Sequence, residues 1–265
     1  MSYWTANRGK ALHYLVAPGI IIALLLAWEF LVDIRDIPNW LLPAPSDIAA
    51  TLFQDAYMLS GHTWVTFIEV ILGFTVAVVA GVLLASAIAL SRSIEQSIYP
   101  IIIASQTIPI IVIAPMLLVW IGYGLTPKII VVALISFFPI TVNMVDGLRA
   151  IDPDMQRLLK TMGANKWQEF TKVRFPSSLP YLFSGLKVAI AVSVIGAVIG
   201  EWVGSKEGLG YLMIRSKPQF QTERVFAAIV ILSFMGVFLF ILIGVLQRLI
   251  TPWHRREIKA KRFED

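Results

Sequence analysis

Long hydrophobic runs separated by short polar connections dominate this chain. A helix needs about 20 mostly apolar residues to cross a bilayer, and six runs reach that length: Leu12–Val32, Val65–Leu90, Tyr99–Ile121, Ile129–Leu148, Leu182–Val203 and Val225–Ile250. The first run is too long for the hydrophobic part of a signal peptide, and no small-residue cleavage site follows it. We therefore predict an all-α, polytopic membrane protein with six transmembrane helices, forming one transmembrane domain over residues 1–265.

The composition supports this class and narrows the chemistry. The chain is 57% hydrophobic and 15% charged, whereas about a quarter of the residues in soluble domains are charged. It contains no cysteine and three scattered histidines, so we expect no metal site, no cysteine nucleophile and no catalytic residue. Membrane topology accounts for the net charge of +5, and we expect no nucleic-acid partner.

The basic residues predict the orientation in the membrane. Fifteen of the 22 Lys and Arg residues lie on the side that holds both termini, six lie on the other side, and Lys187 lies within a span. Connections rich in Lys and Arg stay in the cytoplasm. Both termini and the connection between the fourth and fifth runs are therefore predicted to be cytoplasmic.

This cytoplasmic connection begins with a short amphipathic helix. Asp152 followed by Pro153 is a good N-cap and first helical residue. Apolar side chains then recur at i, i+3, i+4 and i+7 and form one face, made of Met155, Leu158, Leu159 and Met162. Gly163 is a natural stop, so the sequence predicts a helix that ends there.

A second short helix is expected directly afterwards. Asn165 and Gln168 have the spacing of a capping box, and Trp167 and Phe170 are apolar neighbours at i, i+3. Pro176 and Pro180 are expected to end the pattern. Two short helices with a bend at Gly163 would either dock on a protein partner or rest on lipid headgroups.

The loop resembles a segment of a known family, the permease subunits of bacterial ATP-binding cassette importers. Their loop is written EAA, three residues, G, nine residues, then I-x-L-P. The same frame here holds Arg157-Leu158-Leu159, Gly163 and Val173-Arg174-Phe175-Pro176. Glycine and proline match, while the acidic-alanine triplet is replaced. The resemblance extends to Pro43-Ala44-Pro45, Gln106-Thr107-Ile108-Pro109, Gly208-Leu209-Gly210 and Pro252-Trp253-His254.

The resemblance implies that residues 152–176 form a coupling loop that docks on a separate ATPase subunit. The residues it assigns to that contact are Asp154, Arg157, Leu158, Leu159, Gly163, Ala164, Trp167, Phe170 and Pro176. It also implies two permease subunits, here two copies of this chain, an extracytoplasmic substrate-binding protein, and a place in the bacterial cytoplasmic membrane. No G-x-x-x-x-G-K-[ST] motif occurs, so we expect ATP and Mg²⁺ to bind in the partner, no cofactor in this chain, and no enzyme activity of its own.

Polar residues within the apolar runs are candidates for the translocation pathway. The third run is interrupted by Pro109 and Pro115 and carries Ser105, Gln106 and Thr107 before the first break, where freed carbonyls and hydroxyls can line water. An ordinary proline kink is the alternative. Asn143 in the fourth run faces either the same path or a neighbouring helix.

Glu201 is the strongest charged candidate for the pathway. The fifth run carries two rows of small residues at four-residue spacing, which permit close helix packing: Gly196, Gly200 and Gly204, and Gly185, Ala189, Ser193 and Ala197. Glu201 continues the second row and is predicted to point into the bundle, either as part of the pathway or as a packing charge. Glu69 is a weaker case. Glu29, Asp146 and Lys187 lie near span ends and are expected to snorkel or pair there.

The cargo is the least determined feature. Few charges in the spans suit a small polar or heteroaromatic solute at least as well as an anion. Among branches of the family, residues 195–204, 145–149 and 222–228 look most like permeases for thiamine pyrimidine precursors. Import of aliphatic sulfonate, taurine or nitrate is the alternative, and a gradient-driven secondary carrier is less favoured because no inverted repeat or acid–base relay is evident. On the outer side, Pro45-Ser46-Asp47 is expected to begin a short non-spanning helix.

Overall fold

The computed structural model describes residues 3–253, with side chains for residue 16 and for residues 18–253. The chain divides into two compact units. One consists of Met1–Ser60 and Leu212–Val230, and the other consists of Gly61–Tyr211 and Ile231–Asp265. All regular elements in the described part of the chain are helices, as the sequence predicted.

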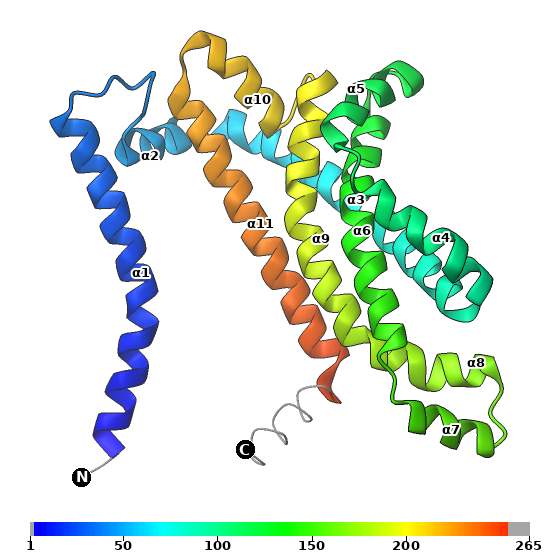
Figure 1. The fold of residues 1–265 in the computed structure, drawn as a ribbon. Helices are drawn as coiled ribbons and strands as arrows, with labels where there is room; N and C mark the ends of the chain where they lie inside the picture. The colour runs from blue at the N-terminus through cyan, green and yellow to red at the C-terminus, as the bar shows by residue number, and fades with distance from the viewer. Residues whose placement is uncertain (1–2, 254–265) are drawn as a thin grey trace. The chain divides into compact units, whose positions relative to one another are not determined.

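Within residues 3–253, four long helices are apolar enough to cross a membrane (Figure 1). They are α3 (Ala56–Leu90), α6 (Leu125–Arg149), α9 (Phe175–Gly204) with its N-terminal extension from Lys166, and α11 (Thr222–Ile250). A fifth span is added if α4 (Arg92–Ser105) and α5 (Ile110–Ile121) are counted together. The first predicted run lies within α1 (Tyr3–Ile34), and the start of that run falls outside the described side chains.

The third predicted run differs from the expectation of one span kinked at two prolines. Its two helices, α4 and α5, meet at 99° across residues 106–109. Pro115 lies inside α5 without breaking it. Pro100 and Pro139 also lie inside helices, because neighbouring helices can satisfy the backbone groups that a proline leaves free.

The predicted break at Pro176 and Pro180 is wrong. A short helix α8 (Lys166–Glu169) continues through a π-helical turn, Phe170–Arg174, directly into α9. In this turn the Phe175 N–H donates to the Phe170 carbonyl, five residues back. Pro176 and Pro180 both follow this turn within α9 without interrupting the helix.

Helices α6 and α9 run antiparallel and approach closely along the predicted rows of small residues. A Cβ atom at Gly185 would lie 2.6 Å from the carbonyl oxygen of Pro139 in α6. A Cβ at Gly196 would lie 3.1 Å from the Cα of Val132, and one at Gly200 would lie 3.3 Å from the Cα of Lys128. The predicted role of these rows is therefore confirmed.

The first unit contains the predicted outer short helix. Helix α2 (Pro45–Gln54) begins at Pro45, as expected. The Glu29 carboxylate accepts hydrogen bonds from the Ser46 N–H at 3.0 Å and the Ser46 hydroxyl at 2.5 Å, so Glu29 does bind a neighbour at the end of its run. Within the same unit, the Arg224 guanidinium lies 2.6 Å from the Asp55 carboxylate.

Replacing Gly185 with alanine is expected to destabilise the protein, because the new methyl group would meet a backbone carbonyl that cannot move alone. Overpacking of this kind costs about 1–3 kcal/mol. Gly236→Ala in α11 is the matched control, since its Cβ would lie 3.9 Å from Val194. Thermal unfolding in detergent should show a lower Tm for Gly185→Ala than for Gly236→Ala, and equal values would contradict the close α6–α9 contact.

Candidate coupling site and translocation pathway

The cytoplasmic loop begins with α7 (Pro153–Thr161), whose ends agree with the sequence signals. The Asp152 carboxylate accepts a hydrogen bond from the Asp154 N–H at 2.8 Å. At the other end Gly163 adopts φ +78°, and the N–H of Ala164 donates to the Leu159 carbonyl at 3.0 Å. This pairing closes the helix as a Schellman motif, which requires the left-handed conformation that glycine adopts at no steric cost.

The predicted capping box at the start of α8 is present. The Asn165 side chain accepts from the Gln168 N–H at 2.8 Å, and the Gln168 side chain accepts from the Asn165 N–H at 3.0 Å. Trp167 and Phe170 stack with ring centroids 5.8 Å apart. Phe170 is 5% exposed and also contacts Phe175, so it anchors the loop to the start of α9.

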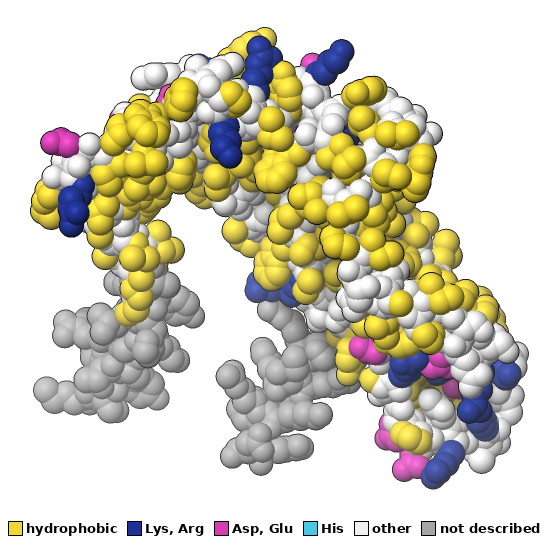
Figure 2. Space-filling view, turned by 45° about the horizontal axis from the view of Figure 1, so that its top comes forward, with side chains coloured by type: hydrophobic (Ala, Val, Ile, Leu, Met, Phe, Trp, Pro, Cys, Tyr) yellow, Lys and Arg dark blue, Asp and Glu magenta, His cyan; other side chains and the backbone are white. Residues whose placement is uncertain are grey.

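Large apolar side chains of the loop face outward. We call Met155, Leu158, Met162 and Trp167 the coupling surface; their exposed fractions are 45%, 53%, 74% and 63%. Figure 2 shows charged side chains of both signs gathered at the end of the second unit where this loop lies. A large apolar group rimmed by charge is typical of a protein-binding surface.

The other residues assigned to the ATPase contact occupy different positions. Asp154 and Arg157 form an ion pair of 3.1 Å on the exposed side of α7. Leu159, Ala164 and Pro176 are half-buried. Which of these residues contacts an ATPase stays a prediction.

The pathway candidates of the third and fourth runs form hydrogen bonds mainly within their own helices. The hydroxyls of Ser105 and Thr107 donate to the Ile102 and Ala104 carbonyls, each at 2.7 Å, at the end of α4. Gln106 is exposed within the break. Asn143 is half-buried and donates to the Pro139 carbonyl in its own helix at 2.8 Å. These local bonds are those of a kinked helix, and a role in the pathway stays a prediction.

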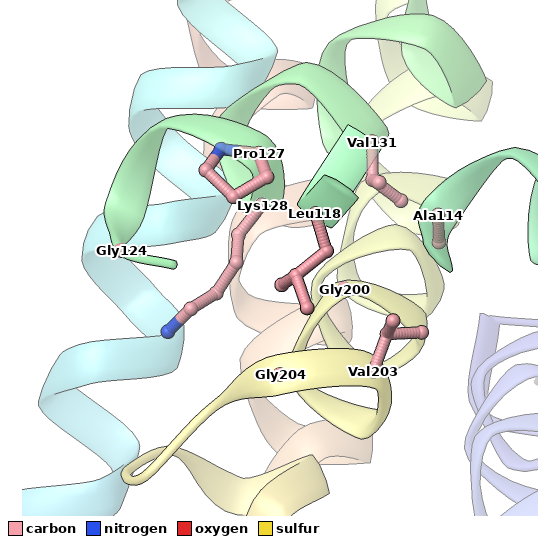
Figure 3. A pocket seen from close by; sticks show the side chains of 9 residues that line it. All are labelled: Ala114, Leu118, Gly124, Pro127, Lys128, Val131, Gly200, Val203 and Gly204. Carbon is pink, nitrogen blue, oxygen red and sulfur yellow. The ribbon is translucent and has the colours of Figure 1, made fainter. Parts of the chain in front are cut away.

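A small pocket lies between α5, α6 and α9 and holds none of these candidates (Figure 3). Its lining is apolar or glycine except for Lys128. It is lined by Ala114, Leu118, Gly124, Pro127, Lys128, Val131, Gly200, Val203 and Gly204. A Cβ at Gly204 would collide with Leu118, so the same glycine row that brings α6 and α9 together also admits α5.

Glu201 points into the bundle, as predicted, and is 1% exposed. One carboxylate oxygen accepts from the Thr66 hydroxyl at 2.6 Å. The other accepts from the backbone N–H groups of Gly210 at 2.5 Å and Tyr211 at 3.3 Å. Glu201 therefore caps the start of α10 (Leu209–Ser216) from the preceding helix, which is the contact pattern of a packing charge.

Helix α3 satisfies the two preceding N–H groups. The Leu209 N–H donates to the Thr66 hydroxyl at 2.9 Å, and the Gly208 N–H donates to His62 Nδ1 at 3.0 Å. Gly208 has φ +112°, and a Cβ there would collide with the Glu201 carboxylate. This close approach explains the glycines of Gly208-Leu209-Gly210.

Sequence reasoning missed Lys128. Its ammonium group donates to Glu69 at 2.5 Å and to the Ser205 hydroxyl at 2.8 Å. Glu69 is fully buried, so Lys128 provides the charge that a buried carboxylate requires. Lys128 is one of the six basic residues that the sequence places on the side opposite the termini. The available signal was one lysine directly before the fourth apolar run, in a chain that carries Glu69 and Glu201 inside other runs.

The chain belongs to the family described as binding-protein-dependent transport system inner membrane component, whose profile matches residues 77–256. It is 38% identical to the formylaminopyrimidine transport permease protein ThiX of Halalkalibacterium halodurans, over 89% of this chain and 94% of the relative. It is 35% identical to the riboflavin transport system permease protein RibX of Chloroflexus aurantiacus, over 89% of both chains. The taurine transport system permease protein TauC of Escherichia coli is 27% identical, over 95% of this chain and 92% of the relative.

The fold is also that of a solved importer. The structure of inward-facing conformations of the MetNI methionine ABC transporter matches 74% of this chain and 97% of the compared chain, with a TM-score of 0.66 and 19% identity. The chain is therefore a multi-pass inner-membrane permease subunit of an ABC importer and not an enzyme. Such permeases work with an ATPase and a substrate-binding protein.

Glu201→Ala is expected to destabilise the start of α10. A buried donor left without an acceptor costs about 1–3 kcal/mol, and the Gly210 N–H would lose the carboxylate oxygen that accepts from it. Glu207→Ala, on the exposed part of the same connection, is the control. Limited proteolysis across residues 205–211 should cleave the Glu201 variant faster and leave the Glu207 variant at the wild-type rate. Equal protection in both variants would disprove the capping role.

Proposed function

We propose that residues 152–176 form the coupling loop and that the coupling surface binds the ATPase subunit. The single observation that carries this proposal is the exposure of Met155, Leu158, Met162 and Trp167 on a loop whose two short helices are both capped. A face made of four large, exposed apolar side chains favours burial against a protein partner. The competing site, a lipid headgroup layer, would not require the stop and restart of the helix at Gly163.

The orientation of the chain in the membrane is part of the same proposal. With the loop facing the ATPase, both termini are cytoplasmic, in agreement with the distribution of Lys and Arg in the sequence. The basic residues beyond Trp253 that contribute to this distribution lie outside the described residues. We further propose that the second permease is another copy of this chain, and that ATP and Mg²⁺ bind in the ATPase because this sequence has no phosphate-binding loop.

Leu158→Asp should weaken binding of the ATPase subunit by about 10- to 100-fold, because burial of a leucine side chain contributes about 1.5–3 kcal/mol. Leu158→Met keeps the coupling surface apolar and should bind as the wild type does. Affinity can be measured between the permease in nanodiscs and the purified ATPase, together with ATP hydrolysis stimulated by the binding protein. Full binding by Leu158→Asp, or uptake by this chain without any ATPase, would refute the coupling assignment.

For the cargo, we propose a small, uncharged heteroaromatic solute of the thiamine pyrimidine-precursor class. Relatives named for formylaminopyrimidine and riboflavin support this class. Two lysines within the spanning helices, Lys128 and Lys187, also support an uncharged cargo, because each already binds another side chain of the protein. Lys128 binds Glu69, and the Lys187 ammonium donates to the Gln247 side chain at 2.6 Å. The second candidate is a sulfonate such as taurine, favoured by the relative at 27% identity.

The two cargo classes can be separated in proteoliposomes that contain this chain, the ATPase and the binding protein. Formylaminopyrimidine should stimulate ATP hydrolysis and enter the vesicles, whereas taurine should do neither. Stimulation by taurine alone would replace the first candidate with the second. The permease without the ATPase serves as the control for leakage.

A further inference from the structure

Two arginines lie at the two ends of the coupling loop, and both reach the same short segment of the chain. Arg149 is the last residue of α6, just before the loop, and Arg174 is the last residue of the π-helical turn near the end of the loop. The segment they contact is the turn from α3 into α4, residues 89–99. All of these residues lie in the second unit.

Arg149 holds the start of α4. Its guanidinium lies 2.5 Å from the Glu95 carboxylate and 4.4 Å from the centre of the Tyr99 ring. Both members of the ion pair are partly exposed, at 41% and 36%, so the pair adds little to stability. A planar guanidinium that pairs and stacks at once fixes orientation, which lysine cannot reproduce.

Arg174 holds the end of α3. It is 22% exposed, and its guanidinium donates to the Ala89 carbonyl at 3.1 Å. That carbonyl belongs to the last turn of α3, where carbonyls lack partners within the helix. The Arg174 Nε also lies 3.9 Å from the Glu169 carboxylate of α8. The Arg174 side chain therefore connects the loop to the last turn of α3.

Helix α4 continues from this segment to the break in the third run. Glu95 lies in the first turn of α4, and Ser105 is its last residue. Ten residues of helix span roughly 15 Å. The 99° break follows at once and carries Gln106 and Thr107. A displacement of the loop that moves Arg149 and Arg174 thus acts on a helix that ends at the break.

We propose that Arg149 and Arg174 are positioning residues that transmit movement of the ATPase-bound coupling loop through α4 to the break at residues 106–109. This inference rests on the proposed function of the loop. The arginines do not contact cargo in this scheme. They determine whether ATP hydrolysis moves the spanning helices.

The test compares transport with ATP hydrolysis in proteoliposomes. Arg149→Gln should bind the ATPase with wild-type affinity but transport at least fivefold less cargo per ATP hydrolysed, and Arg174→Gln should show the same defect. The double reversal Arg149→Glu with Glu95→Arg should regain a substantial part of the lost ratio. Arg92→Gln removes an exposed cation from the same segment and should keep the wild-type ratio.

A direct readout of the break is possible because the chain contains no cysteine. With Gln106→Cys as the only cysteine of this chain, labelling by a water-soluble maleimide should differ between the nucleotide-free and the vanadate-trapped complex. In Arg149→Gln that difference should disappear while the ATPase stays bound. A wild-type transport ratio and a wild-type labelling difference in Arg149→Gln would overturn the relay. A loss of ATPase dependence in the parent protein would instead overturn the coupling loop itself.

Discussion

The close antiparallel contact between α6 and α9 is the constraint on which the second unit depends. Where Gly185, Gly196 and Gly200 lie against α6, the two backbones approach more closely than larger side chains would permit. This contact places Lys128 beside the end of α9, where it reaches Glu69 and Ser205. At the opposite end it brings Arg149 and Arg174 to the two ends of the coupling loop. The packing of α6 against α9 therefore positions both polar sites, the one around Lys128 and the one that contains Arg149 and Arg174.

Buried Glu201 shows how this protein provides hydrogen-bond acceptors for the first N–H groups of a helix that begins inside the fold. Water is scarce near the hydrocarbon region, so the N–H groups at the start of α10 require acceptors from the protein. Glu201, Thr66 and His62 supply them from two other helices. Gly208 and Gly210 are needed because the acceptors occupy the space of a side chain. The contacts of Glu201 are those of a structural charge, and its predicted role in the pathway stays a prediction.

The sequence predicted the parts of this molecule that depend on neighbours in the chain. The caps at Asp152 and Asn165 and the stop at Gly163 are local, and each is confirmed. The rows of glycine in α9 were recognisable from their spacing. The Lys128–Glu69 pair joins residues 59 apart in the chain, and no periodicity connects them. The continuation of the helix through Pro176 was missed because a π-helical turn has no simple sequence signal.

That π-helical turn makes one continuous helix of residues 166–204. A helical rod of 39 residues is roughly 58 Å long, so Trp167 and Glu201 are carried by the same body and rotate together. A π-helical turn holds about one residue more than an α-helical turn, and each residue turns an α-helix by about 100°. The extra residue between Phe170 and Arg174 therefore rotates Trp167 about the helix axis relative to Glu201 and determines the direction in which Trp167 points. This turn therefore fixes the direction in which the coupling surface faces, independently of the shape of that surface.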